Sequence, residues 1–348
     1  FGWGHNVFSL AIAMQNLIWG AVQPITGAFA DKYGNYWNTG TCKISIKDRF
    51  ERRINMFPAG FDKEDVMYSI TAYGDFPIKL PTKNRDHRTG ASTGWMLLSY
   101  KKPVTVSSTE ACADVETHRV DNGGKKVIEK ICFDSQNITD EDIQTYWSAK
   151  TNKAGEWLQL DLGEIMEIRS LQINYADHKA TQYNKAMDMY HQYQIFMSDD
   201  AKNWTLVVDK SKNDKDVPHD YVELLKPIRS RYVKMVNIHH ASGLFAISDF
   251  RVFGKGLSEK PNLVDKFTVH RSSADSRNAM ITWDTQKNAV GHTIYYGIAP
   301  DKLYNSILVY DANYYDFRGL DKGTTYYFAI EAFNSNGVGP LTDVKKVE

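Results

Sequence analysis

The pattern of hydrophobic and polar positions changes abruptly near Gly34. Residues 7–30 carry no acidic or basic side chain. About 20 apolar residues suffice to cross a bilayer as a helix, so this stretch predicts one transmembrane helix. A buried helix of a soluble protein is the alternative interpretation.

After Gly34, short apolar runs and turn residues follow one another along the chain. Residues 53–61 and 66–73 are two such runs separated by a charged turn, which predicts a hairpin. Residues 165–173 alternate between apolar and polar positions, as in a half-buried strand. We therefore expect a mainly β protein, although residues 35–100 hold too few strands to form a sheet domain alone.

Composition narrows the function classes. The chain has 42 Lys and Arg residues against 42 Asp and Glu residues, and a formal net charge of zero. This balance gives no electrostatic reason to expect nucleic acid as a partner. The 20 tyrosines and 8 tryptophans fit β-rich, sugar-handling extracellular proteins, because these rings offer a flat apolar face with a polar edge.

The cysteines show no metal-binding spacing. Cys112 and Cys132 enclose a segment with the turn-forming pair Asn122 and Gly123, which predicts a hairpin. Two states of these cysteines are open: a disulfide at the base of that hairpin, or two buried free thiols.

The end of the apolar stretch resembles a transporter motif. Gly27, Asp31, Lys32 and Gly34 match the loop after the second helix of major facilitator superfamily transporters, although the basic pair that follows in that family is missing. The resemblance implies a membrane location for residues 1–34. One helix cannot enclose a transport path, so we expect a chimeric fragment whose function lies after Gly34.

A second resemblance begins directly after this join. The segments NYWNTG, RRINMFPAGFD, TAYGDFP and TGWMLLSY resemble the last strands of the β-propeller in glycoside hydrolase family 43. In that family the catalytic carboxylates come from earlier blades, so we assign no catalytic residue to this chain. The acids present here are expected to be solvated residues of turns and charged stretches: Asp48, Glu51, Asp62, Glu64, Asp65 and Asp75.

The middle of the chain carries the most specific motifs. The segments GEWLQLDLG, YQIFMSDDAKNW, RYVKM and DFRVFG occur in this order and resemble the coagulation factor 5/8 type C, or discoidin, domain. The resemblance implies a jelly-roll β-sandwich over residues 101–256, also known as carbohydrate-binding module family 32. Within it we expect Trp147, Trp157 and Trp204 to be core residues.

The same resemblance implies a structural calcium ion. The matching positions that supply oxygen ligands are Asp140, Asp142, Thr145 and Asp249. Calcium takes six to eight oxygens, so one acidic loop plus one acid from the last strand makes chemical sense. The family more often has Glu at the position of Asp249, and a plain acidic loop is the alternative.

Sugar contacts in such modules come from loops at one end of the sandwich. Two loops offer suitable side chains, and the candidates are His178, Tyr183 and His239. The neighbouring pair His239 and His240 is a poor metal site, because adjacent residues on a strand point to opposite faces.

The last segment, residues 261–348, resembles a fibronectin type III domain. Trp283 matches its buried strand-B tryptophan, and residues 320–326 match its tyrosine corner. The resemblance implies that this domain acts as a spacer, so we assign it no ligand.

Together these patterns predict four segments: a transporter-like transmembrane helix (1–34), incomplete propeller strands (35–100), a discoidin-like module (101–256) and a fibronectin type III domain (261–348). The expected function is carbohydrate binding by the non-catalytic end of a family 43-like glycosidase acting on plant or host polysaccharide. The alternatives are an active arabinosidase or xylosidase, if the missing propeller is supplied, and a fragment of a transporter. The expected partner is an oligo- or polysaccharide, residues 35–348 are expected in the periplasm or outside the cell, and residues 7–30 would contact a membrane.

Overall fold

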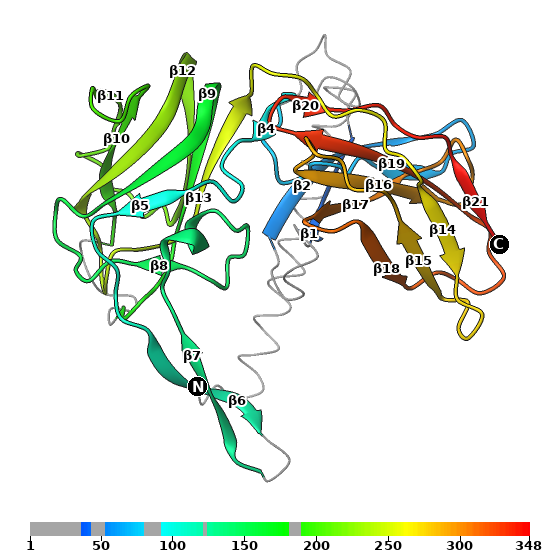
Figure 1. Cartoon of the computed structure of the whole chain (residues 1–348), viewed down its shortest axis with the longest axis horizontal. Coiled ribbons are helices and arrows are strands. Elements are labelled where there is room, and N and C mark those ends of the chain that lie inside the picture. The colour runs from blue at the N-terminus through cyan, green and yellow to red at the C-terminus, as the bar shows by residue number, and fades with distance from the viewer. Residues whose placement is uncertain (1–35, 43–52, 80–91, 121–123, 181–188) are drawn as a thin grey trace, which may run out of the picture.

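The computed structural model describes residues 36–42, 53–79, 92–120, 124–180 and 189–348. These residues form two β-sandwiches and a small N-terminal sheet (Figure 1), with one short 3-10 helix, η1 (Ser135–Ile138). The predicted mainly β fold is therefore confirmed. No helix within the described ranges is long and apolar enough to cross a membrane. The predicted transmembrane helix and transporter-like loop fall outside those ranges.

The first sandwich is a jelly roll with the strand order β11-β10-β12-β9-β13-β4, in which β5 also pairs with β9 and β8 with β13. Its strands are β4 (Met96–Leu97), β5 (Val104–Val106), β8 (Trp147–Ser148), β9 (Trp157–Tyr175), β10 (Gln192–Ser198), β11 (Thr205–Asp209), β12 (His219–His239) and β13 (Ala246–Lys255). Because β4 pairs with β13, this sheet includes residues before position 101.

Two long strands build both layers of the jelly roll. β9 bends at Gly163, which has a φ of +87°, and the ladder between β9 and β12 shifts register on both sides of Ile228. Leu160 before the bend and Leu171 after it are both fully buried in one core cluster. The two halves of β9 therefore face the same core from opposite sides.

The jelly-roll core confirms one of the three tryptophan predictions. Trp147 is fully buried and meets Phe245 edge-on, with ring centroids 5.4 Å apart. Trp157 and Trp204 are half-buried and lie outside the core, so their prediction was wrong. The reason is the alternation of side chains along β9: Leu158 points inward, so Trp157 must point outward.

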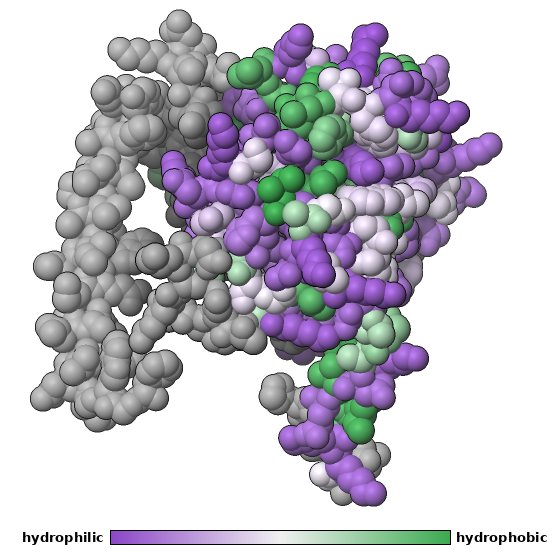
Figure 2. Space-filling model, turned by 90° about the vertical axis from the view of Figure 1, so that its left-hand side faces the viewer, coloured by the Kyte–Doolittle hydropathy of each residue, from purple (hydrophilic) through white to green (hydrophobic). Residues whose placement is uncertain are grey.

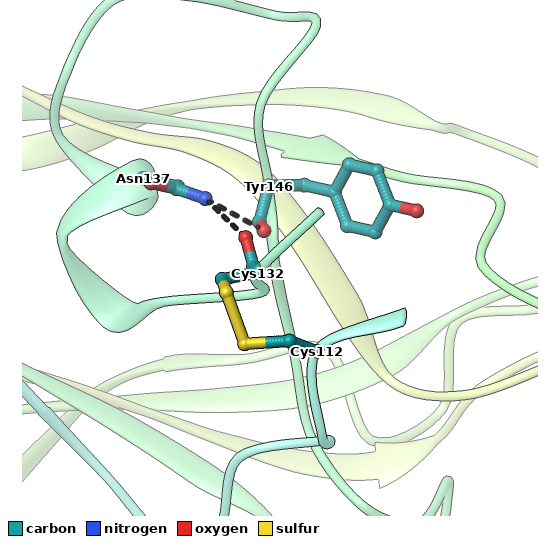
Figure 3. Close-up of a disulfide and its surroundings, with 4 residues drawn as sticks. All are labelled: Cys112, Cys132, Asn137 and Tyr146. Carbon is teal, nitrogen blue, oxygen red and sulfur yellow. Dashed lines mark hydrogen bonds between the residues drawn. A yellow bond between two sulfur atoms is a disulfide. The ribbon is translucent and has the colours of Figure 1, made fainter. Parts of the chain in front are cut away.

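The predicted hairpin projects from the jelly roll as β6 (Ala113–Val120) and β7 (Lys126–Ile131) (Figure 1). A disulfide between Cys112 and Cys132 closes its base (Figure 3), which decides between the two states left open by the sequence. The side-chain amide of Asn137 donates to the carbonyl oxygens of Cys132 and Tyr146, at 3.3 and 3.1 Å. These bonds join the hairpin base to the loop before β8.

The second sandwich packs a sheet of order β14-β15-β18 against one of order β17-β16-β19-β20, with β21 paired to β19. Its strands are β14 (Thr268–Arg271), β15 (Asn278–Thr282), β16 (Gly291–Gly297), β17 (Asn305–Tyr310), β18 (Tyr314–Arg318), β19 (Tyr326–Asn334), β20 (Gly337–Val338) and β21 (Lys345–Val347). Trp283 is buried, and the hydroxyl of Tyr326 bonds to Asp321, five residues upstream. The buried tryptophan and the tyrosine corner are present, while the family assignment stays a prediction.

The N-terminal sheet has the order β1-β2-β3, with β1 (Tyr36–Cys42), β2 (Arg53–Phe61) and β3 (Met67–Ser69). The predicted hairpin is confirmed, since β2 and β3 pair antiparallel. Its turn is held by Asp62, whose carboxylate accepts the backbone N–H groups of Glu64 and Val66, each at 2.9 Å.

Asp62 also joins this hairpin to the second sandwich. Its carboxylate lies 2.8 Å from the ammonium of Lys302 and 2.9 Å from the hydroxyl of Tyr304. The hydrogen bond from Lys302 holds the pKa of Asp62 well below its usual range. The prediction of a merely solvated turn acid was wrong here, because the partners of Asp62 come from a distant part of the chain.

A second correction concerns Asp75, which is buried where the three parts meet. The guanidinium of Arg251, 1% exposed, donates to the carboxylates of Asp75 at 2.6 Å and Glu141 at 3.0 Å, and to the amide of Gln172 at 2.9 Å. An apolar cluster adjoins this ion-pair network, with members from all three parts: Phe76, Met96, Leu97, Tyr100, Phe253, Tyr310 and Phe333. We call this region the joint. It makes the second sandwich a packed neighbour of the jelly roll.

Candidate functional site

The predicted sugar-binding loops meet at one end of the jelly roll. β9 stops at Tyr175 and β12 at His239, and the antiparallel register places Gln192 opposite His239 and Ile247 opposite Tyr175. The rings of Tyr175 and His240 lie 5.8 Å apart, and the backbone N–H of Leu244 donates to the carbonyl oxygen of His178 at 2.9 Å. The loops that follow β9 and β12 therefore emerge at the same edge, which we call the loop end. His178 and His239 both lie there, whereas Tyr183 lies outside the described residues.

His178 lies beside the base of the disulfide hairpin. Its Nδ1 is 2.9 Å from the hydroxyl of Tyr146, and its ring packs against Phe133 with centroids 4.3 Å apart. Burial lowers the pKa of His178, so the imidazole is neutral at pH 7. Its Nε2 is buried and has no hydrogen-bond partner within the described residues. A neutral ring nitrogen next to aromatic rings is suited to bind a hydroxyl group.

A second aromatic group at the loop end was missed by the sequence analysis. The rings of Tyr175 and His191 are stacked with centroids 3.8 Å apart, and His240 lies 4.5 Å from His191. The pKa of His191 is lowered to about 3 and that of His240 to about 4, mainly because both rings are buried. These imidazoles are therefore uncharged at neutral pH. His191 belongs to no motif, so no pattern along the chain pointed to it.

His239 and His240 turn to different neighbours, as expected for adjacent residues at the end of a strand. His239 contacts the ring of Tyr190 at 4.9 Å, whereas His240 is 4% exposed and meets Phe245 edge-on. Across the described ranges, no three His, Cys, Asp or Glu side chains are grouped so that they could hold a metal ion.

The four predicted calcium ligands are only partly gathered. The carboxylate of Asp140 accepts the hydroxyl of Thr145 at 2.7 Å and the backbone N–H of Asp142 at 3.1 Å. Asp249 is fully buried and accepts the amide of Asn174 at 3.0 Å. The carboxylate of Asp142 instead accepts the N–H of Gln144, which caps its own loop.

Asp140 lies in an environment that disfavours its charged form. The pKa of Asp140 is raised to about 6, mainly because the carboxyl group is buried, and the negative charge of Asp249 adds to the effect. None of the ion pairs among the described residues includes Asp140. Asp140 and Asp249 are thus close enough to repel each other.

Comparison with known proteins identifies the domain that carries this loop end. Residues 115–248 match the family model of the F5/8 type C domain. This match covers the larger part of the jelly roll, and it confirms the discoidin-like domain predicted from the motifs. No curated protein sequence matches the chain.

Three solved structures illustrate the similarity. A chitosan-binding module 2 in complex with chitotriose, from a chitosanase/glucanase of Paenibacillus sp. IK-5, is 20% identical, with a TM-score of 0.33 over 45% of this chain and 99% of that one. The module CpGH89CBM32-4 of Clostridium perfringens, in complex with GlcNAc-α-1,4-galactose, is 14% identical, with a TM-score of 0.33 over 47% of this chain and 97% of that one. A structure described as a glycoside hydrolase is 18% identical, with a TM-score of 0.34 over 63% of this chain and 43% of that one. Similarities this weak say nothing about the ligand of the present chain.

Proposed function

We propose that the jelly roll binds carbohydrate through its loop end. The observation that carries this proposal is the environment of His178: a neutral imidazole with a buried, unpartnered Nε2, beside Tyr146 and Phe133, in an F5/8 type C domain. Sugar sites combine aromatic faces, which contact C–H groups of the pyranose ring, with a few polar groups that bind its hydroxyls. His178 supplies the polar group, and His239 and Tyr183 are the further proposed contacts.

The proposal includes a calcium ion that holds the loop before β8. Asp140, Thr145 and Asp249 would supply oxygen ligands, together with backbone oxygens of the loop that contains Asp142. The support is the raised pKa of Asp140 beside a second buried carboxylate. The ion would fix Thr145, which directly precedes Tyr146, the hydrogen-bond partner of His178. Its role is therefore structural.

The wider context also belongs to this proposal. The chain is the non-catalytic end of a family 43-like glycosidase that acts on plant or host polysaccharide, in the periplasm or outside the cell. The disulfide between Cys112 and Cys132 supports an oxidising compartment. The second sandwich is a fibronectin type III domain. There are two alternatives. One is an active glycosidase, if the missing part of the β-propeller is supplied, and the other is a fragment of a transporter.

A glycan array with the intact chain tests the sugar site. We expect retention on at least one plant or host glycan, and about tenfold weaker binding after His178→Ala, since one well-placed contact is worth roughly 1–2 kcal/mol. His270→Ala is the matched control, because His270 is an exposed histidine on the second sandwich. The proposal fails if no glycan is retained, or if the two variants bind equally.

A further inference from the structure

The outer face of one jelly-roll sheet carries an aromatic and cationic surface away from the loop end. Lys234 on β12 lies opposite Gln159 on β9 and Phe196 on β10. Its chain neighbours Val233 and Met235 are fully buried in the core. Because side chains alternate along a strand, Lys234 points outward together with Gln159 and Phe196.

Two tryptophans enclose the ammonium group of Lys234. Its Nζ lies 4.3 Å from the ring centroid of Trp157 and 5.6 Å from that of Trp204. Trp157 begins β9 and Trp204 directly precedes β11, so the two rings reach Lys234 from strands on either side of β12. Both rings are half-buried and keep solvent-accessible surface.

No ion pair compensates the charge of Lys234 among the residues that the structure describes. Arg231, another cation of β12, is bound by the carboxylate of Asp161 through two hydrogen bonds, at 2.8 and 2.9 Å. The ammonium of Lys234 instead lies over two ring faces, which attract a cation without neutralising it. A fixed, uncompensated ammonium favours an anionic ligand.

The surface extends across four strands. Phe196 lies opposite Leu206 on β11, and Leu206 is 44% exposed. The row Gln159, Lys234, Phe196 and Leu206 therefore crosses three strand intervals, roughly 14 Å at the usual strand spacing. Figure 2 views the molecule from the side on which β10 and β11 lie in Figure 1, and it shows apolar patches among hydrophilic side chains. An extended ligand suits this shape better than a single small molecule.

We propose that this surface, the Lys234 face (Trp157, Gln159, Phe196, Trp204, Leu206 and Lys234), binds a polysaccharide made of uronate residues. The indole rings would contact the C–H faces of pyranose rings, the ammonium would pair with a carboxylate, and Gln159 would bind hydroxyl groups. This is a second site, on other strands than the loop end. Charge complementarity selects the uronate chain over a neutral one, since a neutral glycan leaves Lys234 uncompensated.

Isothermal titration with sodium polygalacturonate tests the proposal, and polygalacturonate of the same length with fully methylated carboxyl groups serves as the neutral probe. Lys234→Met keeps an apolar chain between the rings and removes the charge. We expect this variant, and Trp204→Ala, to bind polygalacturonate about tenfold more weakly. Binding of the methyl ester is expected to be weak in all variants, and salt should weaken only the binding of the acid form.

Lys226→Met is the matched control, because Lys226 lies on the same strand, is exposed and changes the net charge equally. His178→Ala separates the two sites, since it should leave polygalacturonate binding unchanged. The proposal is overturned if wild type does not bind polygalacturonate. It is also overturned if Lys234→Met binds like Lys226→Met, or if only His178→Ala weakens binding. Melting curves confirm that each variant is folded.

Discussion

Asp140 and Glu141 are neighbours in the chain, yet they lie in opposite electrostatic environments. Glu141, 3% exposed, faces the joint, where Arg251 compensates its charge at 3.0 Å. Asp140 faces Thr145 and Asp249, and its pKa is raised to about 6. A positive φ of +62° at Glu141 helps to send the two carboxylates to different sides. The buried carboxylate of Glu141 is thus compensated by a cation of the chain at the joint, whereas burial at the acidic loop disfavours the charged form of Asp140.

The largest effect is expected from removing the cation of the joint. Arg251→Met leaves Asp75 and Glu141 buried without their partner, which should lower the free energy of unfolding by about 3–5 kcal/mol. Urea denaturation measures the change. Arg231→Met is the control: its pair with Asp161 is more than a third exposed on the arginine side, so its loss should cost much less. Equal losses in the two variants would show that the joint does not depend on Arg251.

Supplying a cation to the acidic loop should give the next largest effect. Calcium at 100 times its dissociation constant is expected to stabilise the intact chain by about 2.7 kcal/mol, and EDTA should reverse this. Thermal melting with and without EDTA checks the prediction. Asp140→Asn should abolish the response, whereas Asp177→Asn, an exposed acid, should keep it. A calcium response that survives Asp140→Asn would place the ion elsewhere.

The pH dependence of stability in EDTA gives a smaller effect. The pKa of Asp140 rises from 3.8 to about 6 on folding, so the folded state binds the proton more tightly. Deprotonation of Asp140 therefore destabilises the fold as pH rises through this window, on the order of 1–2 kcal/mol after solvent screening. Neutral His191 and His240 act in the opposite sense, since their lowered pKa values cost stability as pH falls below about 6.5.

The difference between wild type and Asp140→Asn isolates the contribution of Asp140 from that of the histidines. Unfolding free energies measured between pH 4 and pH 7 should converge at the acidic end and separate toward neutral pH, with the variant more stable there. Parallel curves would mean that Asp140 titrates equally in the folded and unfolded chain.

The smallest effect concerns Tyr73, which packs against the apolar cluster of the joint. The hydroxyl of Tyr73 donates to the carboxylate of Glu331 at 3.2 Å and accepts the hydroxyl of Thr293 at 3.0 Å. Tyr73→Phe should cost about 1 kcal/mol, well below Arg251→Met, because Glu331 keeps its shorter hydrogen bond from the hydroxyl of Tyr295, at 2.8 Å. Tyr314→Phe, on a residue that is 56% exposed, is the control in the same denaturation experiment. A loss as large as that of Arg251→Met would show that Glu331 depends on Tyr73 for its burial.

Predictions that depend on local alternation held better than those that depend on distant partners. The hairpin of β2 and β3 follows from patterns within a few residues. Trp147 was predicted as core by residue type and is fully buried. Trp157 was predicted as core by residue type, although its own strand pattern places it outward. Asp75 was predicted as solvated, because its partner Arg251 is 176 positions away.

At the loop end, too, local patterns predicted more than distant contacts did. The side chains of two loops suggested His178 and His239, and the family resemblance implied the acidic loop. Contacts between the loops after β9 and β12 bring the two histidines to one edge. His191 and the contact of His178 with Phe133 could not be predicted, since they depend on how separate loops pack. The sugar and calcium assignments remain predictions.

The sequence by itself determined the β class, the F5/8 type C domain and the segments that become hairpins, because alternation and turn residues act over short distances. Only the tertiary structure decided that Cys112 and Cys132 meet, that Arg251 neutralises two distant acids, and that Lys234 lies between two tryptophans. Each of these depends on which strands become neighbours. Strand order is set by burial of the whole core, and short-range patterns do not encode it.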